Sequence, residues 1–192
     1  KIRAARSKAK AELNLIVIAI ESYKDKYGHY PPDVPTNSPA WPRVNQLYFE
    51  LMGTRFVNNQ YETLDGNARI AASAIPTTFG AGVTGFINCT RAANADDAPP
   101  AKTFLIQLKP NQYGETAPNS GVRLLACSVQ WPENNDFKPV PGNPGLNPWR
   151  YVSSNPTNNP GVFDLWVDLF VGGKTNRISN WSDQAQIVNT SF

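Results

Sequence analysis

The sequence predicts an α+β fold in a single domain, with one long N-terminal amphipathic helix packed against an antiparallel β-sheet with long loops. The first 27 residues carry a helical repeat of apolar side chains, whereas several later segments are short, apolar and β-branched. Many turns lie between them, since the 192 residues include 17 prolines and 13 glycines. A chain of this length suits one domain that buries roughly 70% of its unfolded surface.

The helix expected over residues 1–27 is defined by its apolar stripe and by its stop. At ~100° per residue, this stripe falls within an arc of roughly 80°. It consists of Ile2, Ala5, Ala9, Leu13, Ile16, Ile20, Tyr23 and Tyr27. Gly28 can adopt the left-handed conformation that closes a helix, and Pro31 and Pro32 cannot continue it. The helix is therefore expected to end at Tyr27.

The start of this helix has the wrong charge for a helix N-terminus. Five basic and no acidic side chains occupy the first ten residues, and no capping residue precedes the stripe. We therefore expect residue 1 to be the edge of a processed piece with more helix upstream; a frayed basic end is the alternative. The longest apolar run, 15–20, is too short to cross a membrane, so any anchor is expected ahead of Lys1.

The formal net charge of +3 comes from this basic cluster, because the rest of the chain carries a net charge of −2. No aromatic interleaving and no second basic stripe accompany the cluster, so nucleic acid is not an expected partner. A collar beside a membrane, or against acidic groups of a partner, is favoured.

Residues 28–53 are expected to form a connection and a second helix. Prolines punctuate 31–42, and a short apolar stripe then predicts a helix over 41–52 that ends at Gly53. Residues 54–146 form a variable insert. Its candidate strands share β-branched and large apolar residues and lie at 69–75 (alternatively a helical turn), 83–90, 103–109 and 122–131. Polar or proline-rich loops are expected at 92–100 and 132–148.

Residues 147–192 are expected to form the C-terminal sheet and a loop, with strands over 149–152 and 162–170. In the second strand, alternation places Phe163, Leu165, Val167 and Leu169 on one face. Trp166 shares the other face with Asp164 and Asp168. These two carboxylates would lie roughly 13 Å apart along a strand, too far for a glycosidase pair, and are expected to be solvated surface acids.

No arrangement of residues predicts an enzyme. His29, the single histidine, lies in a turn without a Ser, Cys or Asp partner at a motif distance and is expected to face solvent. No G-x-S-x-G, HExxH, P-loop or GxGxxG motif occurs, and 80–85 is expected to be a flexible loop. Asp96 and Asp97 are expected in a polar loop.

The two cysteines, Cys89 and Cys127, belong to no CxxC or Cys/His cluster, so a zinc site is not expected. In an oxidising compartment they could form one disulfide that ties two strand-like segments together. The alternative is two separate buried thiols, since cysteine often packs as a small apolar residue.

Two parts of the chain resemble a known family. The helical part has Ala9-Lys10-Ala11-Glu12, then the apolar run 15–20, and ends Tyr27-Gly28-His29-Tyr30-Pro31. It resembles type IV pilin-like proteins, and most narrowly the major pseudopilins of type II secretion just past their hydrophobic anchor. The C-terminal part contributes Asn147-Pro148-Trp149-Arg150-Tyr151, Phe163-Asp164-Leu165-Trp166 and Asn180-Trp181. The resemblance covers 1–53 and 147–181 and leaves the middle unmatched.

The resemblance implies a membrane-anchored prepilin, cleaved by a prepilin peptidase and assembled into a short helical filament in the cell envelope. The domain would be periplasmic and anchored in the inner membrane. Its partners would be further copies of itself and other pseudopilins, packed helix to helix. The assembly helix would present Leu13, Leu15, Ile16, Ile18 and Ile20. Leu15 and Ile18 project away from the main stripe, so they could serve a neighbour unless this chain's own loops cover them.

One segment departs from the family's pattern. Major pseudopilins hold calcium in the loop before the closing Asn-Trp, whereas this chain has Asn176 and Arg177 where the family has acidic residues. Asp168 and Asn176 are weak calcium candidates that cannot supply six or more oxygens, and a neighbouring arginine repels a cation. No calcium and no other cofactor is therefore expected, and packing should hold the loop.

Two alternatives remain open at this point. One is a minor, tip-located pilin whose enlarged middle region binds substrate or a surface ligand. The other is an exported glycan-binding module with Trp131, Trp149 and Trp166 as sugar platforms, although these tryptophans are expected to be core or loop anchors instead.

Overall fold

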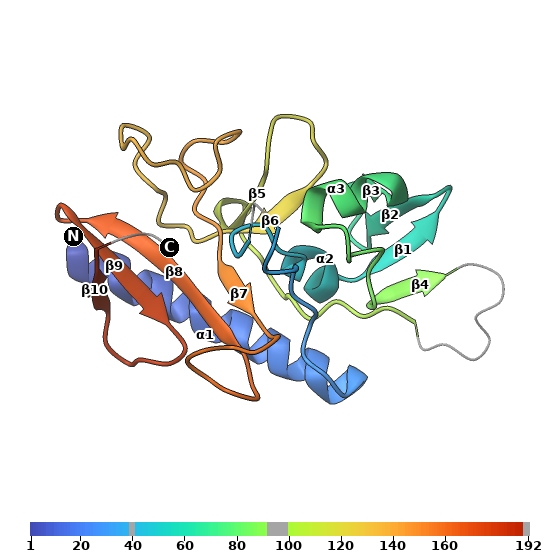
Figure 1. Ribbon diagram of the computed structural model, residues 1–192, viewed down its shortest axis with the longest axis horizontal. Coiled ribbons are helices and arrows are strands. Elements are labelled where there is room, and N and C mark those ends of the chain that lie inside the picture. Colours follow the sequence, from blue (N-terminus) through green and yellow to red (C-terminus); the bar gives the residue numbers. More distant parts are fainter. Residues whose placement is uncertain (39–40, 92–99, 190–192) are drawn as a thin grey trace.

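The computed structural model describes residues 1–38, 41–91 and 100–189 and has the α+β composition that the sequence predicts. Helix α1 (Ile2–Tyr27) is one uninterrupted helix that runs beneath the rest of the molecule (Figure 1). Gly28 closes it in the left-handed conformation at φ 79°, and its amide donates to the Lys24 carbonyl. Lys1 stands at the N-cap position without a side-chain cap bond, as the basic N-terminus led us to expect.

The remaining elements are short, and their order follows the chain from α2 to β10. They are α2 (Leu47–Met52), β1 (Thr54–Val57), β2 (Gln60–Thr63), β3 (Arg69–Ala71), η1 (Ala72–Ala74), α3 (Ile75–Phe79), β4 (Cys89–Arg91), η2 (Pro110–Gln112), β5 (Tyr113–Glu115), β6 (Arg123–Leu125), β7 (Arg150–Val152), β8 (Asp164–Val171), β9 (Lys174–Ser179) and β10 (Gln186–Val188).

These strands form more than the one sheet that the sequence suggested. A four-stranded sheet in the order β10-β9-β8-β7 is antiparallel throughout. A second sheet has the order β3-β2-β1-β4, in which β4 pairs parallel to β1, and β5 and β6 form a separate hairpin. Figure 1 shows the two larger sheets toward opposite ends of the molecule, with α1 under the C-terminal one.

The C-terminal sheet packs on α1 through the face of β8 that alternation predicted. Phe163, Leu165, Val167 and Leu169 are all buried, which confirms that expectation. The segment expected as a loop over 172–179 is instead strand β9, joined to β8 by a two-residue turn at Gly172 and Gly173. Both glycines have positive φ, which is the geometry of a tight hairpin turn. Because β9 pairs with β8 along its whole length, strand pairing and not loop packing holds this segment.

Several other predicted boundaries were wrong. Helix α2 begins at Leu47 rather than near 41, β4 contains only the end of 83–90, and 103–109 forms no strand. Phe104 and Leu105 are buried as that apolar run suggested, but Gln107 adopts a left-handed φ of 58° that interrupts an extended run. The ambiguous 69–75 divides into β3 followed by a helical turn. Residues 92–99, including Asp96 and Asp97, lie outside the described residues.

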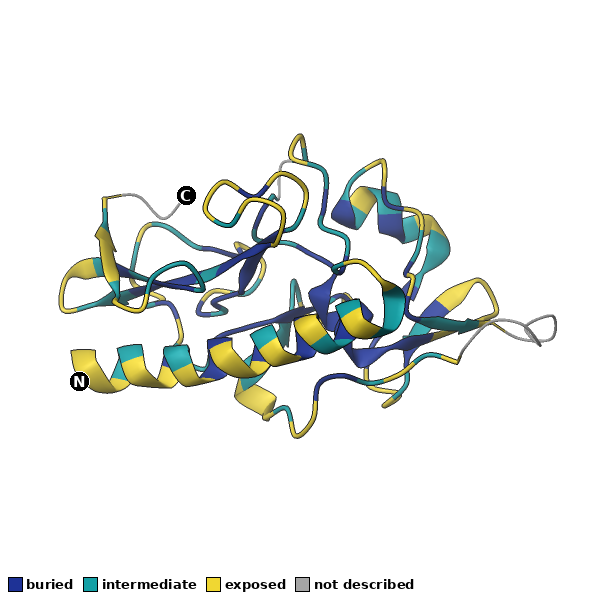
Figure 2. Ribbon diagram, turned by 90° about the horizontal axis from the view of Figure 1, so that it is seen from below, coloured by how far each residue is buried: buried dark blue, intermediate teal, exposed yellow. Residues whose placement is uncertain are grey.

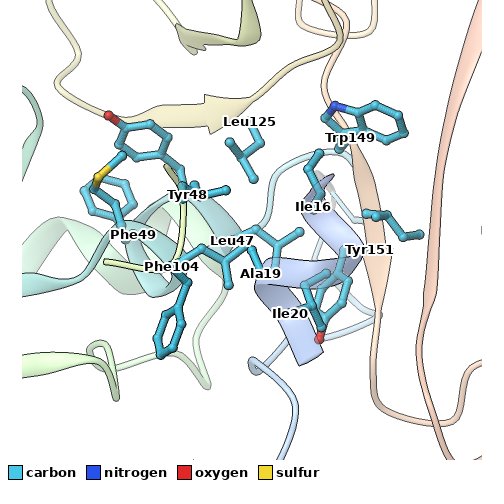
Figure 3. Close-up of a cluster of buried hydrophobic side chains, with 14 of the residues drawn as sticks. Ile16, Ala19, Ile20, Leu47, Tyr48, Phe49, Phe104, Leu125, Trp149 and Tyr151 are labelled. Carbon is cyan, nitrogen blue, oxygen red and sulfur yellow. The ribbon is translucent and has the colours of Figure 1, made fainter. Parts of the chain in front are cut away.

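The main core lies where α1 meets α2 and the ends of the sheets. Figure 3 shows Ile16, Ala19 and Ile20 of α1 beside Leu47 of α2 and Tyr151 of β7, all of them buried. In Figure 2 the opposite side of α1 is exposed along most of its length. The helix is therefore amphipathic in the structure, with its inner stripe shared by the whole domain.

A buried carboxylate joins α1, α2 and the segment before β4. Glu50 accepts hydrogen bonds from the amides of Ile87 at 3.1 Å and Asn88 at 2.8 Å, and from the Tyr23 hydroxyl at 3.3 Å. The Asn88 side chain donates in turn to the Glu50 carbonyl at 2.7 Å. Burial raises the pKa of the Glu50 carboxyl to about 7, although these hydrogen bonds and nearby His29 act in the opposite direction.

Candidate functional site: the outer face of the first helix

The five apolar residues expected to form an assembly helix divide between two faces of α1. Leu13, Ile16 and Ile20 are buried in the domain's own core and cannot meet a partner. Leu15 and Ile18 are 64% and 62% exposed. The alternative in which loops of this chain cover them is therefore wrong for the described part of the chain. Only these two of the five remain as candidate contact residues.

A third exposed residue extends this surface beyond the helix. Ile106, 83% exposed, lies in the segment that follows the buried Phe104 and Leu105. Leu15, Ile18 and Ile106 flank an apolar cavity of about 150 Å³. We call these three residues the apolar patch. An exposed apolar cluster of this kind marks a contact surface more often than isolated exposed residues do.

The position of Ile106 follows from the contacts of the segment that carries it. The Phe104 amide donates to the Leu51 carbonyl at 2.7 Å, and its ring lies 5.7 Å from the ring of Tyr23 on α1. These contacts hold the chain against the helix, and the left-handed Gln107 directly follows Ile106. Sequence reasoning expected a strand here and missed Ile106, because the only signal was one isoleucine within an apolar run.

The basic N-terminal cluster has two roles in the structure. Arg6 Nε donates to Asn176 Oδ1 at 2.9 Å, and Lys10 Nζ donates to the carbonyls of Ser179 at 2.9 Å and Ser182 at 3.1 Å. These two cations therefore bind the helix to β9 and the turn after it. Lys1, Arg3 and Lys8 are exposed and form the outward part of the collar.

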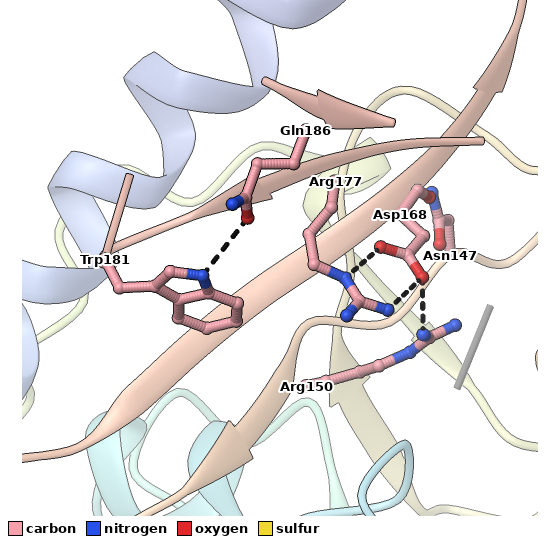
Figure 4. Close-up of polar contacts among 6 residues, drawn as sticks. All are labelled: Asn147, Arg150, Asp168, Arg177, Trp181 and Gln186. Carbon is pink, nitrogen blue, oxygen red and sulfur yellow. Dashed lines mark hydrogen bonds and ion pairs between the residues drawn. The ribbon is translucent and has the colours of Figure 1, made fainter. Parts of the chain in front are cut away.

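The calcium candidates are engaged in other contacts. Both carboxylate oxygens of Asp168 are held by guanidinium groups, with Arg177 Nε at 2.8 Å and Arg150 at 2.9 Å (Figure 4). Asn176 accepts the bond from Arg6 and donates to the Lys174 carbonyl at 2.9 Å. The expectation of no calcium site stays a prediction, and this cationic surrounding supports it because it opposes a metal cation.

The two aspartates of β8 are buried, so their interpretation as solvated surface acids was wrong. Asp168 and Arg150 are fully buried, whereas Arg177 is partly exposed. Burial lowers the pKa of Arg150 to about 10, while Asp168 acts to raise it. Asp164 accepts hydrogen bonds from the amides of Asn158 and Asn159, each at 2.9 Å. Both carboxylates are positioning groups that connect β8 to its neighbours.

In this structure no disulfide joins Cys89 and Cys127, which are both free thiols. Cys89 lies in β4 beside Thr54, whereas Cys127 follows β6 and its amide donates to the Asn147 carbonyl. Cys89 thus belongs to the β3-β2-β1-β4 sheet, whereas Cys127 lies outside the strands. Burial raises the pKa of both thiols, and nearby Glu12 raises that of Cys127 further. The alternative of two separate thiols holds, with Cys127 buried and Cys89 half-buried.

The tryptophans proposed as sugar platforms are mostly internal. Trp131 and Trp149 are buried in the domain and cannot stack on a ligand. Trp166 is half-buried, and its ring contacts that of Trp181 at 5.6 Å. It lines a polar cavity together with Trp41, a residue that the sequence did not single out.

His29 stands in the turn after α1, with its Nδ1 2.9 Å from the Tyr30 carbonyl oxygen, and it is exposed as expected. Within residues 1–38, 41–91 and 100–189, no three His, Cys, Asp or Glu side chains gather in a way that could hold a metal ion. None of the helices in the described part is long and apolar enough to cross a membrane.

The chain is thus an α+β domain built on one long helix. The outer face of this helix carries the apolar patch and a basic collar. Comparison with known proteins adds no relative, because no family model, no curated protein and no solved structure matches the chain.

Proposed function

We propose that this chain is a structural subunit of a type II secretion pseudopilus or a related type IV pilus-like filament. The observation that carries the proposal is the pair of exposed residues, Leu15 and Ile18, on a helix whose opposite face is the domain's core. A helix of this kind can serve its own domain and a neighbouring subunit simultaneously. The proposal also rests on the resemblance of 1–53 and 147–181 to major pseudopilins. It includes the proposal that the α+β fold of this domain is a pilin-like fold.

The size of the apolar patch sets what it can contribute. Full burial of one Leu or Ile side chain contributes roughly 2 kcal/mol, so the three residues together contribute roughly 6 kcal/mol at most. Association costs about 4–15 kcal/mol in lost translational and rotational freedom. The patch therefore offsets only the lower part of this range, so it suits the orientation of neighbouring subunits better than their assembly. Further helix ahead of Lys1, anchored in the inner membrane, would supply the remaining contacts.

Photocrosslinking in the native host tests the contact directly. The full gene is expressed with Leu15→p-benzoylphenylalanine or Ile18→p-benzoylphenylalanine, and adducts are identified by mass spectrometry. The matched control is Val57→p-benzoylphenylalanine, because Val57 is 46% exposed on β1 and lies outside the apolar patch. We expect adducts from positions 15 and 18 with the first helix of a second copy or of another pilin-like subunit, and none from position 57.

Two results would overturn the proposal. One is the absence of protein adducts at positions 15 and 18. The other is a gene that encodes, ahead of Lys1, neither a Gly-Phe-like cleavage site nor the stretch of about 20 apolar residues that a membrane-spanning helix needs.

A further inference from the structure

A second cavity, unrelated to the apolar patch, opens where the connection after α1 meets the loop between β7 and β8. It has a volume of about 710 Å³, which lies within the range of small-molecule sites. Trp41 comes from the connection, Trp166 from β8, and Asn155 from the loop. It shares no residue with the cavity beside Leu15 and Ile18.

The walls of this cavity are held by two carboxylates. Asp33 accepts hydrogen bonds from the amides of Ser153 at 2.9 Å and Ser154 at 3.0 Å, which binds the end of β7 to the connection. Asp164 accepts from the Asn158 amide at 2.9 Å and from its side chain at 3.0 Å, which holds the far side of the loop. The cavity is therefore formed before any ligand arrives, and this lowers the entropic cost of binding.

Several polar side chains of the lining make no hydrogen bond within the described part of the chain. They are neutral amides and hydroxyls, and they belong to Thr36, Asn37, Asn155 and Thr157. The indole nitrogens of Trp41 and Trp166 also have no acceptor among the described residues, but both atoms are buried, so these two residues line the cavity with ring surface and not with a donor. Trp166 is held in place, with Trp181 against its edge and the Arg177 guanidinium 5.7 Å from its ring. The lining thus combines indole surface with uncommitted neutral donors and acceptors.

The charge of the lining narrows the class of ligand. Among the lining residues that the structure describes, Asp164 is the one ionisable group, its oxygens already accept hydrogen bonds, and none is cationic. An anion would therefore meet no opposite charge, and a purely apolar ligand would leave amides and hydroxyls unpaired. A neutral molecule with hydroxyls on its edges and C–H groups on its faces suits both the lack of cationic groups and the mixture of indole rings with polar side chains.

We infer that this cavity, built around Trp41, Trp166 and Asn155, binds a neutral carbohydrate. Indole rings pack against the C–H faces of a sugar, and the amides and hydroxyls of the loop exchange hydrogen bonds with its hydroxyls. The site goes beyond the role of the chain as a filament subunit, since it would let each subunit contact a polysaccharide in its surroundings.

Titration of the purified chain with defined oligosaccharides tests this inference. Maltotetraose, cellotetraose, chitotetraose and mannotetraose are added while calorimetry and tryptophan emission are recorded, with trigalacturonate as an anionic comparison. We expect at least one neutral tetramer to bind more tightly than roughly 10 mM. Trp41→Ala should weaken that binding about tenfold, since an aromatic contact contributes on the order of 1 kcal/mol beyond area.

Asparagine at position 155 offers a matched pair of variants. Asn155 has a positive φ of 49°, and Asn119, outside the cavity, has 59°; both are exposed. Glycine accepts this backbone conformation, so Asn155→Gly and Asn119→Gly remove an amide without strain. We expect Asn155→Gly to weaken binding roughly fivefold, the effect of one hydrogen bond, and Asn119→Gly to leave it unchanged.

The inference is overturned if no neutral tetramer binds, if trigalacturonate binds as well as the best neutral sugar, or if the two glycine variants bind alike. A Leu15→Ser, Ile18→Ser double variant should retain full sugar binding. This variant distinguishes the two proposals, because a loss of the filament contact would leave sugar binding unchanged, and a failure to bind sugar would leave the filament proposal unaffected.

Discussion

The buried carboxyl group of Glu50 should make the stability of this domain fall as the pH rises. The group is fully buried between α1 and the segment before β4, and its pKa is raised from 4.5 to about 7. Between these two values the unfolded chain loses its proton while the folded chain keeps it. The folded state then binds more protons, and the free energy of unfolding decreases with increasing pH.

The magnitude follows from the size of the shift. A difference of about 2.5 pKa units corresponds to about 3 kcal/mol at 1.36 kcal/mol per unit. The contribution is unaffected below pH 4.5, is lost progressively up to about pH 7, and stays constant above that value. For a domain whose total stability is on the order of 10 kcal/mol, this is a large fraction.

Urea denaturation of the wild type and of Glu50→Gln between pH 4.5 and 8.5 measures this effect. Glutamine keeps an oxygen that can accept from the Ile87 and Asn88 amides but does not ionise. The stability difference between the two proteins should therefore shift in favour of Glu50→Gln by about 3 kcal/mol as the pH rises. All other titrating groups are common to both proteins and cancel. Parallel pH profiles would refute the reasoning.

Asp65 provides a control of opposite sign. Burial alone would raise the pKa of this carboxyl, but hydrogen bonds from Thr63 and Asn67 outweigh burial and lower it. Its contribution is thus present above the pKa of the unfolded chain and is lost as the pH falls through its folded value. The stability deficit of Asp65→Asn should consequently shrink on acidification, whereas that of Glu50→Gln should grow.

Three further outcomes test the packing. Asp168→Asn should cost about 3–5 kcal/mol in urea denaturation, because it leaves two guanidiniums without their carboxylate; a loss below 1 kcal/mol would contradict the buried network. Ile16→Ala should cost about 2–5 kcal/mol, while Leu15→Ala on the outer face should cost less than about 0.5 kcal/mol; equal losses would mean that Leu15 is buried. Without reductant, Cys89 and Cys127 should react slowly with a maleimide in the native chain, because burial raises the pKa of both thiols. Both should react after denaturation, and a denatured chain that does not react would indicate a disulfide.

Features that depend on neighbours in the sequence were predicted correctly. The long helix, its stop at Gly28 and the buried face of β8 all follow from periodicity and from one capping residue. The strand predicted over 103–109 failed although its residues do bury apolar area. Hydrophobicity indicates that Phe104 and Leu105 are inside, but strand pairing needs a partner whose position the local sequence does not encode.

The candidate sites were predicted only in part. The sequence singled out Leu15 and Ile18 by their place on the helix, but Ile106 and Trp41 join their sites through segments far along the chain. The alternation of polar and apolar residues along β8 showed that Asp164 and Asp168 share one face of the strand. It could not show which parts of the chain cover that face. In the structure, loops and arginines cover that face, and the aspartates are inside.

What the sequence by itself determined is therefore the long amphipathic helix, where that helix ends, and which side of β8 is apolar, because each depends on residues a few positions apart. Tertiary structure alone decided that Arg6 binds Asn176, 170 residues away, and that Asp33 binds Ser154, 121 residues away. Contacts of that range depend on how sheets and loops close on the helix. A carboxylate or an isoleucine thus becomes core, ion pair or contact surface only once the chain has folded around it.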